Sequence, residues 1–178
     1  MVKTSGITVI IEDNQAMNAD KTIREQLLAL LRGGNAHMSF GDAVSGFPLK
    51  EINRRLPNAS YTVWHLLEHM RIAQWDIVDF VRNPDHISPE FPGGYWPKED
   101  EMAAASQWKK TIQGFRLDLK SAEKIVKDPK TDLFSPIPHA KDYTVFLEIL
   151  TLADHNAYHV GEFVTLRRVL NMKPIKEY

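Results

Sequence analysis

Residues 108–126, WKKTIQGFRLDLKSAEKIV, show the pattern that decides the fold class. Apolar residues recur there after alternating steps of four and three positions, at Trp108, Ile112, Phe115, Leu119, Ala122 and Val126. This alternation gathers them on one side of an α-helix and leaves charged residues on the other. The stretch therefore predicts a helix of a helical bundle, beginning after Pro97 and ending near Lys127.

Three further segments have a helical apolar period and clear stop signals. They run from Asp20 to Arg32 before Gly33 and Gly34, from an N-cap at Ser60 to Arg82 before Asn83 and Pro84, and from about Tyr143 to Asn171 before Pro174.

The connections 83–100 and 128–142 are longer than a simple up-and-down bundle needs. We predict an all-α chain, a four-helix bundle with long crossover loops in a single domain spanning residues 1–178. The β-branched segment from Ile7 to Ile11 predicts a short edge strand or a segment packed on the bundle.

The composition excludes several classes of function. The 178 residues have a formal net charge of -1, so no basic excess is available to neutralise nucleic-acid phosphates. Cysteine is absent, which removes disulfides, thiolate metal sites and a cysteine nucleophile. No apolar run approaches the roughly 20 residues of a membrane span. We expect a cytoplasmic protein with a small-molecule substrate, no nucleic-acid partner and no membrane partner.

The aromatic residues are predicted to serve two purposes. Trp64, Trp75 and Trp108 occur at helical spacings and are expected in the core. Tyr95, Trp96 and His139 lie in the two long connections, where they are candidates for the rim of a pocket. The alternative is that the aromatic side chains only pin these loops to the core.

Four of the seven histidines form two His-x-x-x-His pairs, His65 with His69 and His155 with His159. Residues four apart lie one turn apart on the same helical face, so their imidazoles can converge on one metal ion. The alternative is that these are buried histidines bonded to the backbone or to nearby carboxylates. His-Glu-x-x-His and Glu-x-x-His are both absent, which removes the zincin and the di-iron carboxylate patterns. A site of three imidazoles with open coordination positions, typical of a catalytic metal, remains.

Two stretches resemble the DinB-like superfamily of metal-dependent four-helix bundles. They are residues 64–76, WHLLEHMRIAQWD, and residues 153–168, ADHNAYHVGEFVTLRR. The resemblance runs from the first helix to Asn171, and residues 1–15 form an N-terminal extension outside it. It implies a metal site built from His69, His155 and His159. It leaves His65 as a proton shuttle, an extra ligand or a group that orients a ligand, and leaves Glu162 to orient a ligand, bind the ion or stay neutral.

The resemblance also implies a class of chemistry. Characterised relatives include S-transferases and isomerases that use low-molecular-weight thiols such as bacillithiol or mycothiol. We therefore expect a metal-dependent transferase or hydrolase in which Zn²⁺ or Ni²⁺ activates such a thiol or water toward a small electrophile. The alternatives are a non-catalytic metal- or small-molecule-binding protein of a stress response and a purely structural helical module. A homodimer is expected from the frequency of twofold assemblies.

Overall fold

The computed structural model describes the backbone of residues 5–172 and the side chains of residues 17–172. This part of the chain is mostly helical, as predicted. Its α-helices are α1 (Ser5–Arg32), α2 (Phe40–Val44), α3 (Val63–Arg82), α4 (Ala105–Lys127) and α5 (Val145–Val169). Two 3₁₀ turns, η1 (Leu49–Glu51) and η2 (Gly93–Tyr95), and a hairpin of β1 (Pro136–Ile137) and β2 (Ala140–Thr144) complete the elements.

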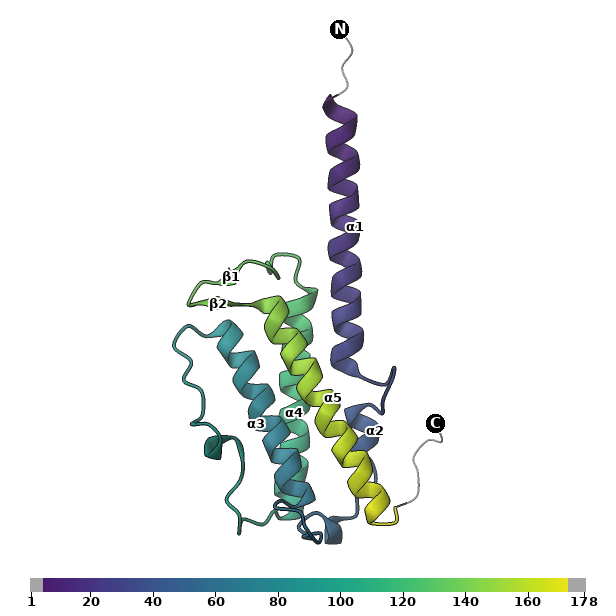
Figure 1. Ribbon diagram of the computed structural model, residues 1–178, viewed down its shortest axis with the longest axis vertical. Helices are drawn as coiled ribbons and strands as arrows, with labels where there is room; N and C mark the ends of the chain where they lie inside the picture. The colour runs from purple at the N-terminus through teal and green to yellow at the C-terminus, as the bar shows by residue number, and fades with distance from the viewer. Residues whose placement is uncertain (1–4, 173–178) are drawn as a thin grey trace.

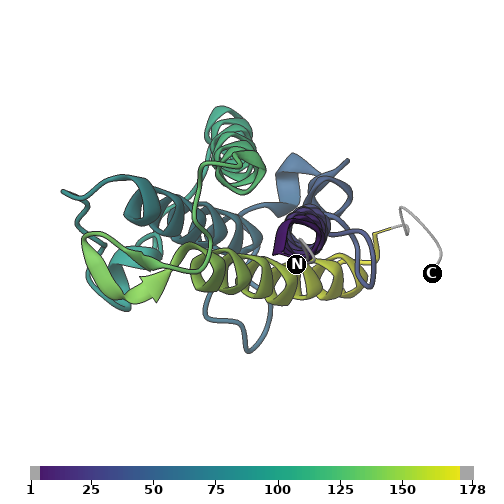
Figure 2. The same cartoon turned by 90° about the horizontal axis from the view of Figure 1, so that it is seen from above.

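The four long helices contact one another in a cycle. Helix α3 contacts both α4 and α5, and the C-terminal part of α1 contacts the same two helices (Figure 1). Figure 2, seen from above, shows α3 and α5 running alongside each other, with α4 on the other side of α3 from α5. The short helix α2 packs on α5 near the C-terminal end of that helix. Among the described residues, no helix combines the length and apolar character that a bilayer crossing requires.

Helix α1 corrects the prediction for the N-terminal residues. The segment from Ile7 to Ile11 lies inside this helix and forms no strand, and the helix begins well before Asp20. β-branched residues lower helix propensity only slightly, and no glycine or proline interrupts the chain between Gly6 and Gly33. In Figure 1 the N-terminal part of α1 extends beyond the other helices.

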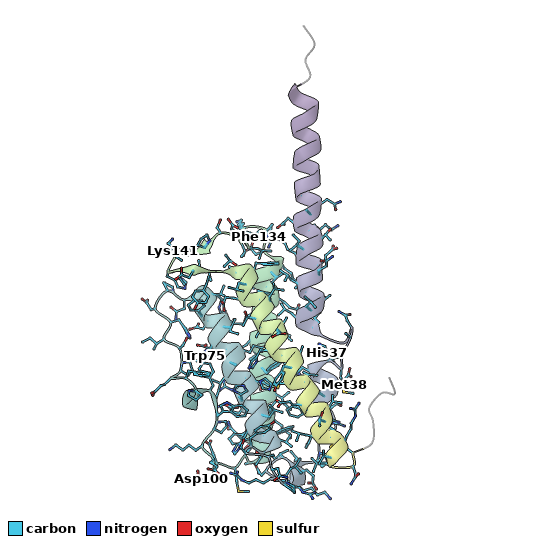
Figure 3. All side chains as sticks on the ribbon, viewed as in Figure 1. His37, Met38, Trp75, Asp100, Phe134 and Lys141 are labelled. Atoms are coloured by element: carbon cyan, nitrogen blue, oxygen red, sulfur yellow. The ribbon has the colours of Figure 1, made fainter. Side chains whose placement is uncertain are left out.

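The other helix boundaries were predicted to within a few residues at their C-terminal ends and less well at their starts. Helix α3 ends at Arg82 as expected, but its N-cap is Thr62 and not Ser60. Helix α4 begins at Ala105, several residues after Pro97, and the intervening chain contacts the first turn of α3, where the Glu101 carbonyl accepts from His65. The predicted loop 128–142 contains the hairpin, which Phe134 and Lys141 mark at one end of the molecule in Figure 3.

Two apolar clusters fill the interior at successive levels. One cluster joins the N-terminal halves of α3 and α4 to the C-terminal half of α5 and to α2. The other joins the C-terminal halves of α3 and α4 and the N-terminal half of α5 to α1. Between them lies a polar level, where Gln74 donates to the Phe115 carbonyl and accepts from Asn156 at 2.9 Å. The histidines of interest on α3 and α5 lie close to this level. The fold therefore places polar side chains of α3 and α5 face to face inside the protein.

The predicted core tryptophans behave differently from one another. Trp64 and Trp108 are buried, as predicted, but Trp75 is 37% exposed. Its ring lies edge-on to His86, with the ring centroids 5.4 Å apart. Trp75 therefore covers a loop histidine on the surface of α3 instead of filling the core.

Candidate metal centre

Three histidines from two helices meet in the interior. His69 comes from α3, and His155 and His159 come from successive turns of α5. One ring nitrogen of each lies within 4.8 Å of those of the other two. The antiparallel packing of α3 and α5 therefore unites the three residues that the resemblance implied.

The distances suit a shared metal ion. The Nε2 atom of His69 lies 3.1 Å from Nε2 of His159 and 3.2 Å from Nε2 of His155. Two imidazole nitrogens bound to one Zn²⁺ at their usual distance of about 2.0–2.1 Å, in tetrahedral directions, lie about 3.3 Å apart. Small rotations of the rings would therefore open the site enough for one ion.

Hydrogen bonds on the far side of two rings decide where their protons are. His69 donates from Nδ1 to the Tyr95 carbonyl at 2.9 Å, because a carbonyl can only accept. His159 donates from Nδ1 to the Glu162 carboxylate at 2.5 Å. When these rings are neutral, their Nε2 atoms both present lone pairs, and these lone pairs face each other. Such a contact is repulsive unless a cation lies between the nitrogens.

The third ring does not remove this conflict. Nδ1 of His155 is buried without a hydrogen-bond partner, so a neutral His155 has one proton to offer, to one neighbour. Burial, with the charges of His159 and His69 adding to it, lowers the pKa of His155 to about 4. Burial is also the main reason that the pKa of His69 is lowered. At neutral pH these two rings are therefore neutral bases, the state that ligates metal ions.

The η2 turn fixes the orientation of His69. Trp96 stacks on the His69 ring with the planes 3° apart and the centroids at 3.9 Å. The backbone of Tyr95 accepts the Nδ1 proton of His69, and its hydroxyl donates to Asp76 at 2.6 Å. Both predicted rim residues of this loop thus lie at the cluster, where they hold a histidine ring in place.

Glu162 occupies the corresponding position behind His159. Its carboxylate accepts from His159 through one oxygen and from the Tyr61 hydroxyl, at 2.9 Å, through the other. Burial and this bond raise the pKa of Tyr61 to about 12, so the hydroxyl stays protonated. No sequence pattern indicated a role for Tyr61, because 101 residues separate it from Glu162.

His65 lies outside the cluster. Its Nδ1 accepts from the Thr62 backbone amide, and Thr62 caps the His65 amide in return, a capping box at the start of α3. Its Nε2 then carries the proton and donates to the Glu101 carbonyl at 2.8 Å. With both nitrogens engaged, His65 has no lone pair to offer an ion, and its place in the structure is that of a helix cap.

His139 also lies away from the cluster. Its Nε2 donates to the Phe80 carbonyl at 2.7 Å, and its ring packs edge-on to the Phe80 ring. Phe80 is three turns beyond His69 on α3, roughly 16 Å along the helix axis. The structure therefore does not bring His139 to the three histidines.

A second histidine cluster was missed by the sequence analysis. His86 lies between two carboxylates of α3, with Nε2 2.7 Å from Asp76 and Nδ1 2.8 Å from Asp79. Burial acts to lower the pKa of His86, but the hydrogen bonds and charges of the two carboxylates together raise it. Asp76 also accepts from Tyr95, so this cluster anchors the loop that holds His69.

No family model matches the chain, and no curated protein or solved structure shows significant similarity to it. The function has to be argued from the site itself.

Proposed function

We propose that the protein is a metal-dependent enzyme in which His69, His155 and His159 hold one divalent ion, Zn²⁺ or Ni²⁺. The observation that carries the proposal is the contact between His69 and His159, whose Nε2 atoms face each other at 3.1 Å while both Nδ1 protons are committed elsewhere. Nitrogen lone pairs held this close in a buried site favour binding of a cation.

The ligand set supports a catalytic role over a structural one. Three neutral imidazoles leave the full charge of a divalent ion uncompensated and leave coordination positions open to small molecules. When bound, such an ion lowers the pKa of a thiol or a water that reaches it and polarises an electrophile. Apolar packing on both sides of the polar level stabilises the helices without the ion.

Neighbouring residues orient two of the three histidine rings. The Tyr95 carbonyl and the Trp96 ring hold His69, and the Glu162 carboxylate holds His159, so both lone pairs are aimed before the ion arrives. Partners of this kind fix the tautomer of a ligand and increase its basicity. The carboxylate of Glu162 is engaged by two donors and is thus placed to orient a ligand.

A low-molecular-weight thiol is the proposed nucleophile, with water as the alternative. The chain has no cysteine, so no protein thiolate competes for the ion and any thiol must be a co-substrate. The resemblance to the DinB-like superfamily points to the same chemistry. The contacts of α1 and α3 with both α4 and α5 support a bundle of this type.

The test uses tag-free protein stripped by a chelator and reloaded with Zn²⁺ or Ni²⁺. Loaded protein should accelerate the reaction of a small thiol with a chlorodinitrobenzene electrophile, or the hydrolysis of an activated ester. Stripped protein and loaded His155→Ala protein should not. Stoichiometric binding with no turnover of thiol, ester or further electrophiles would instead indicate a non-catalytic metal-binding protein.

A further inference from the structure

A groove lies between α2 and α4. This open groove has a volume of about 510 Å³ and is bordered by Gly41 and Val44 of α2, by Ser45 just after it and by one face of α4. Volumes of this size are typical of sites for small organic ligands. None of the three histidines, nor the partners that orient them, lines this groove.

The charge of the groove is entirely positive. Lys109, Arg116 and Lys120 line it, and none of the described lining residues is acidic. Helix α4 as a whole carries six basic and two acidic residues, in a chain whose net charge is -1. The positive charge is therefore concentrated on this helix.

These three cations have no partner within residues 17–172. Two other basic residues differ from them: Lys127 of α4 binds Glu123 at 2.6 Å, and Arg71 of α3 binds Glu68 at 2.7 Å. No hydrogen bond or ion pair engages the side chains of Lys109, Arg116 and Lys120 in the described part of the chain. Like charges held on one face repel one another, and a bound anion would relieve that repulsion.

The groove also has an apolar component. Val44 is buried at its base, Ile112 is half-buried, and Leu117 is 55% exposed beside Arg116. An exposed leucine among cations leaves apolar surface that a purely ionic ligand would not cover. The lining thus matches a molecule with an anionic group and an apolar portion.

The walls are held in place without a ligand. Phe40 of α2 stacks on Phe115 of α4, with the ring centroids 3.7 Å apart. The buried Arg167 of α5 donates to the carbonyls of Ala43 and Ser45 at 3.0 and 2.9 Å. Because α2 is fixed to both neighbouring helices, binding in the groove requires little reorganisation of the backbone.

The spacing on α4 suggests how such a ligand would lie. Arg116 and Lys120 are one turn apart, about 6 Å, and can converge on one anionic group. Lys109 is two turns from Arg116, roughly 10 Å along the axis, with Ile112 between them. We propose that the α2–α4 groove binds a free low-molecular-weight amphipathic anion, a phosphate monoester or a carboxylate with a short apolar portion. The proposal is independent of the metal centre.

The probe for this site is hexyl phosphate, titrated into the full chain by calorimetry, with inorganic phosphate and hexanol as its two halves. Saturable binding of hexyl phosphate that is tighter than binding of inorganic phosphate or of hexanol supports a ligand site in the groove. The Arg116→Gln/Lys120→Gln variant should bind it roughly five- to tenfold more weakly, as expected for two exposed ion pairs. The Leu117→Asn variant should bind hexyl phosphate more weakly and should bind inorganic phosphate with unchanged affinity.

The matched control is Lys110→Gln/Lys124→Gln, which removes the same charge from α4 outside the groove. It should bind like the unmodified protein, and circular dichroism should show equal helicity for all variants. Equal weakening in both double variants, or no saturable binding, would overturn the proposal. Binding only to vesicles of anionic lipid would assign the face to a membrane surface and would also overturn it.

Discussion

Helix α3 contributes side chains to two histidine clusters of opposite character. At one, His69 meets two further imidazoles and no carboxylate touches its Nε2. At the other, His86 has a carboxylate on each nitrogen, within 2.8 Å. The pKa of His69 is lowered, mainly by burial, whereas the pKa of His86 is raised by its two carboxylate partners.

The difference distinguishes a candidate metal site from a self-sufficient ion cluster. The His86 cluster supplies its own cation, because a protonated imidazole between two carboxylates satisfies every partner. The cluster of His69, His155 and His159 instead brings three Nε2 atoms together, and a carboxylate touches only the outer nitrogen of His159. It is the cluster that could hold a cation from outside.

The largest expected effect comes from removing a ligand. His69→Ala, His155→Ala or His159→Ala should each weaken metal binding more than ~100-fold, beyond the 10–100-fold typical of losing a group that merely orients a ligand. Competition with a chromophoric chelator measures this.

The control for these variants is His65→Gln. Glutamine at the third position of a helix is an ordinary capping-box residue, so the cap at Thr62 should survive and metal affinity should stay unchanged. A loss at His65→Gln equal to that at His69→Ala would mean that four histidines bind the ion.

Bound metal should stabilise a protein that is already folded. The apolar clusters are continuous without the ion, so the stripped protein should remain helical and unfold cooperatively. At a hundredfold excess over Kd the ion should add about 2.7 kcal/mol to the free energy of unfolding. Thermal unfolding followed by circular dichroism checks both points, and collapse of the helical signal on stripping would show that the ion is structural.

A smaller effect is expected at Glu162. Glu162→Gln keeps an oxygen for the His159 proton but removes the negative charge, so metal affinity should fall roughly tenfold. Tyr61→Phe removes only the hydroxyl bond to Glu162 and should cost less. A larger loss at Tyr61→Phe than at Glu162→Gln would contradict the role assigned to the carboxylate.

The His86 cluster should respond to pH and not to metal. Its folded pKa is raised above the ordinary 6.5, so its stabilisation is complete below about pH 6.5 and is lost as pH rises through the folded value. His86→Gln should therefore reduce the free energy of unfolding by roughly 1–2 kcal/mol at pH 6 and by less at pH 9. Urea unfolding at the two pH values measures the difference. A greater loss of unfolding free energy at pH 9 than at pH 6 would contradict a raised pKa of His86.

Much of the helical framework was predictable from local patterns. The apolar spacing in residues 108–126 correctly predicted α4. The stop signals at Gly33 and Asn83 correctly predicted the C-terminal ends of α1 and α3. The start of α3 was misplaced because its cap pairs Thr62 with a histidine, whereas the usual box uses Glu or Gln. Helix α2 and the hairpin were missed because elements of two to five residues hold too few turns or pairs to show a period.

The candidate site was predictable only in part. The i, i+4 spacing brought His155 and His159 together, but spacing alone treated His65 and His69 alike. The distinction depends on helix position, since His65 lies in the first turn, where its nitrogens meet backbone groups. Tyr61 with Glu162 and His86 with Asp76 become neighbours only through the chain path, which no local pattern encodes.

Metal content is the most direct test of the central claim. Tag-free protein, incubated with Zn²⁺ or Ni²⁺ and freed of excess ion by gel filtration, should carry one ion per chain by elemental analysis. His86→Gln protein should carry the same amount, and His159→Ala protein much less. A stoichiometry near zero for the unmodified protein with both metals would contradict the account.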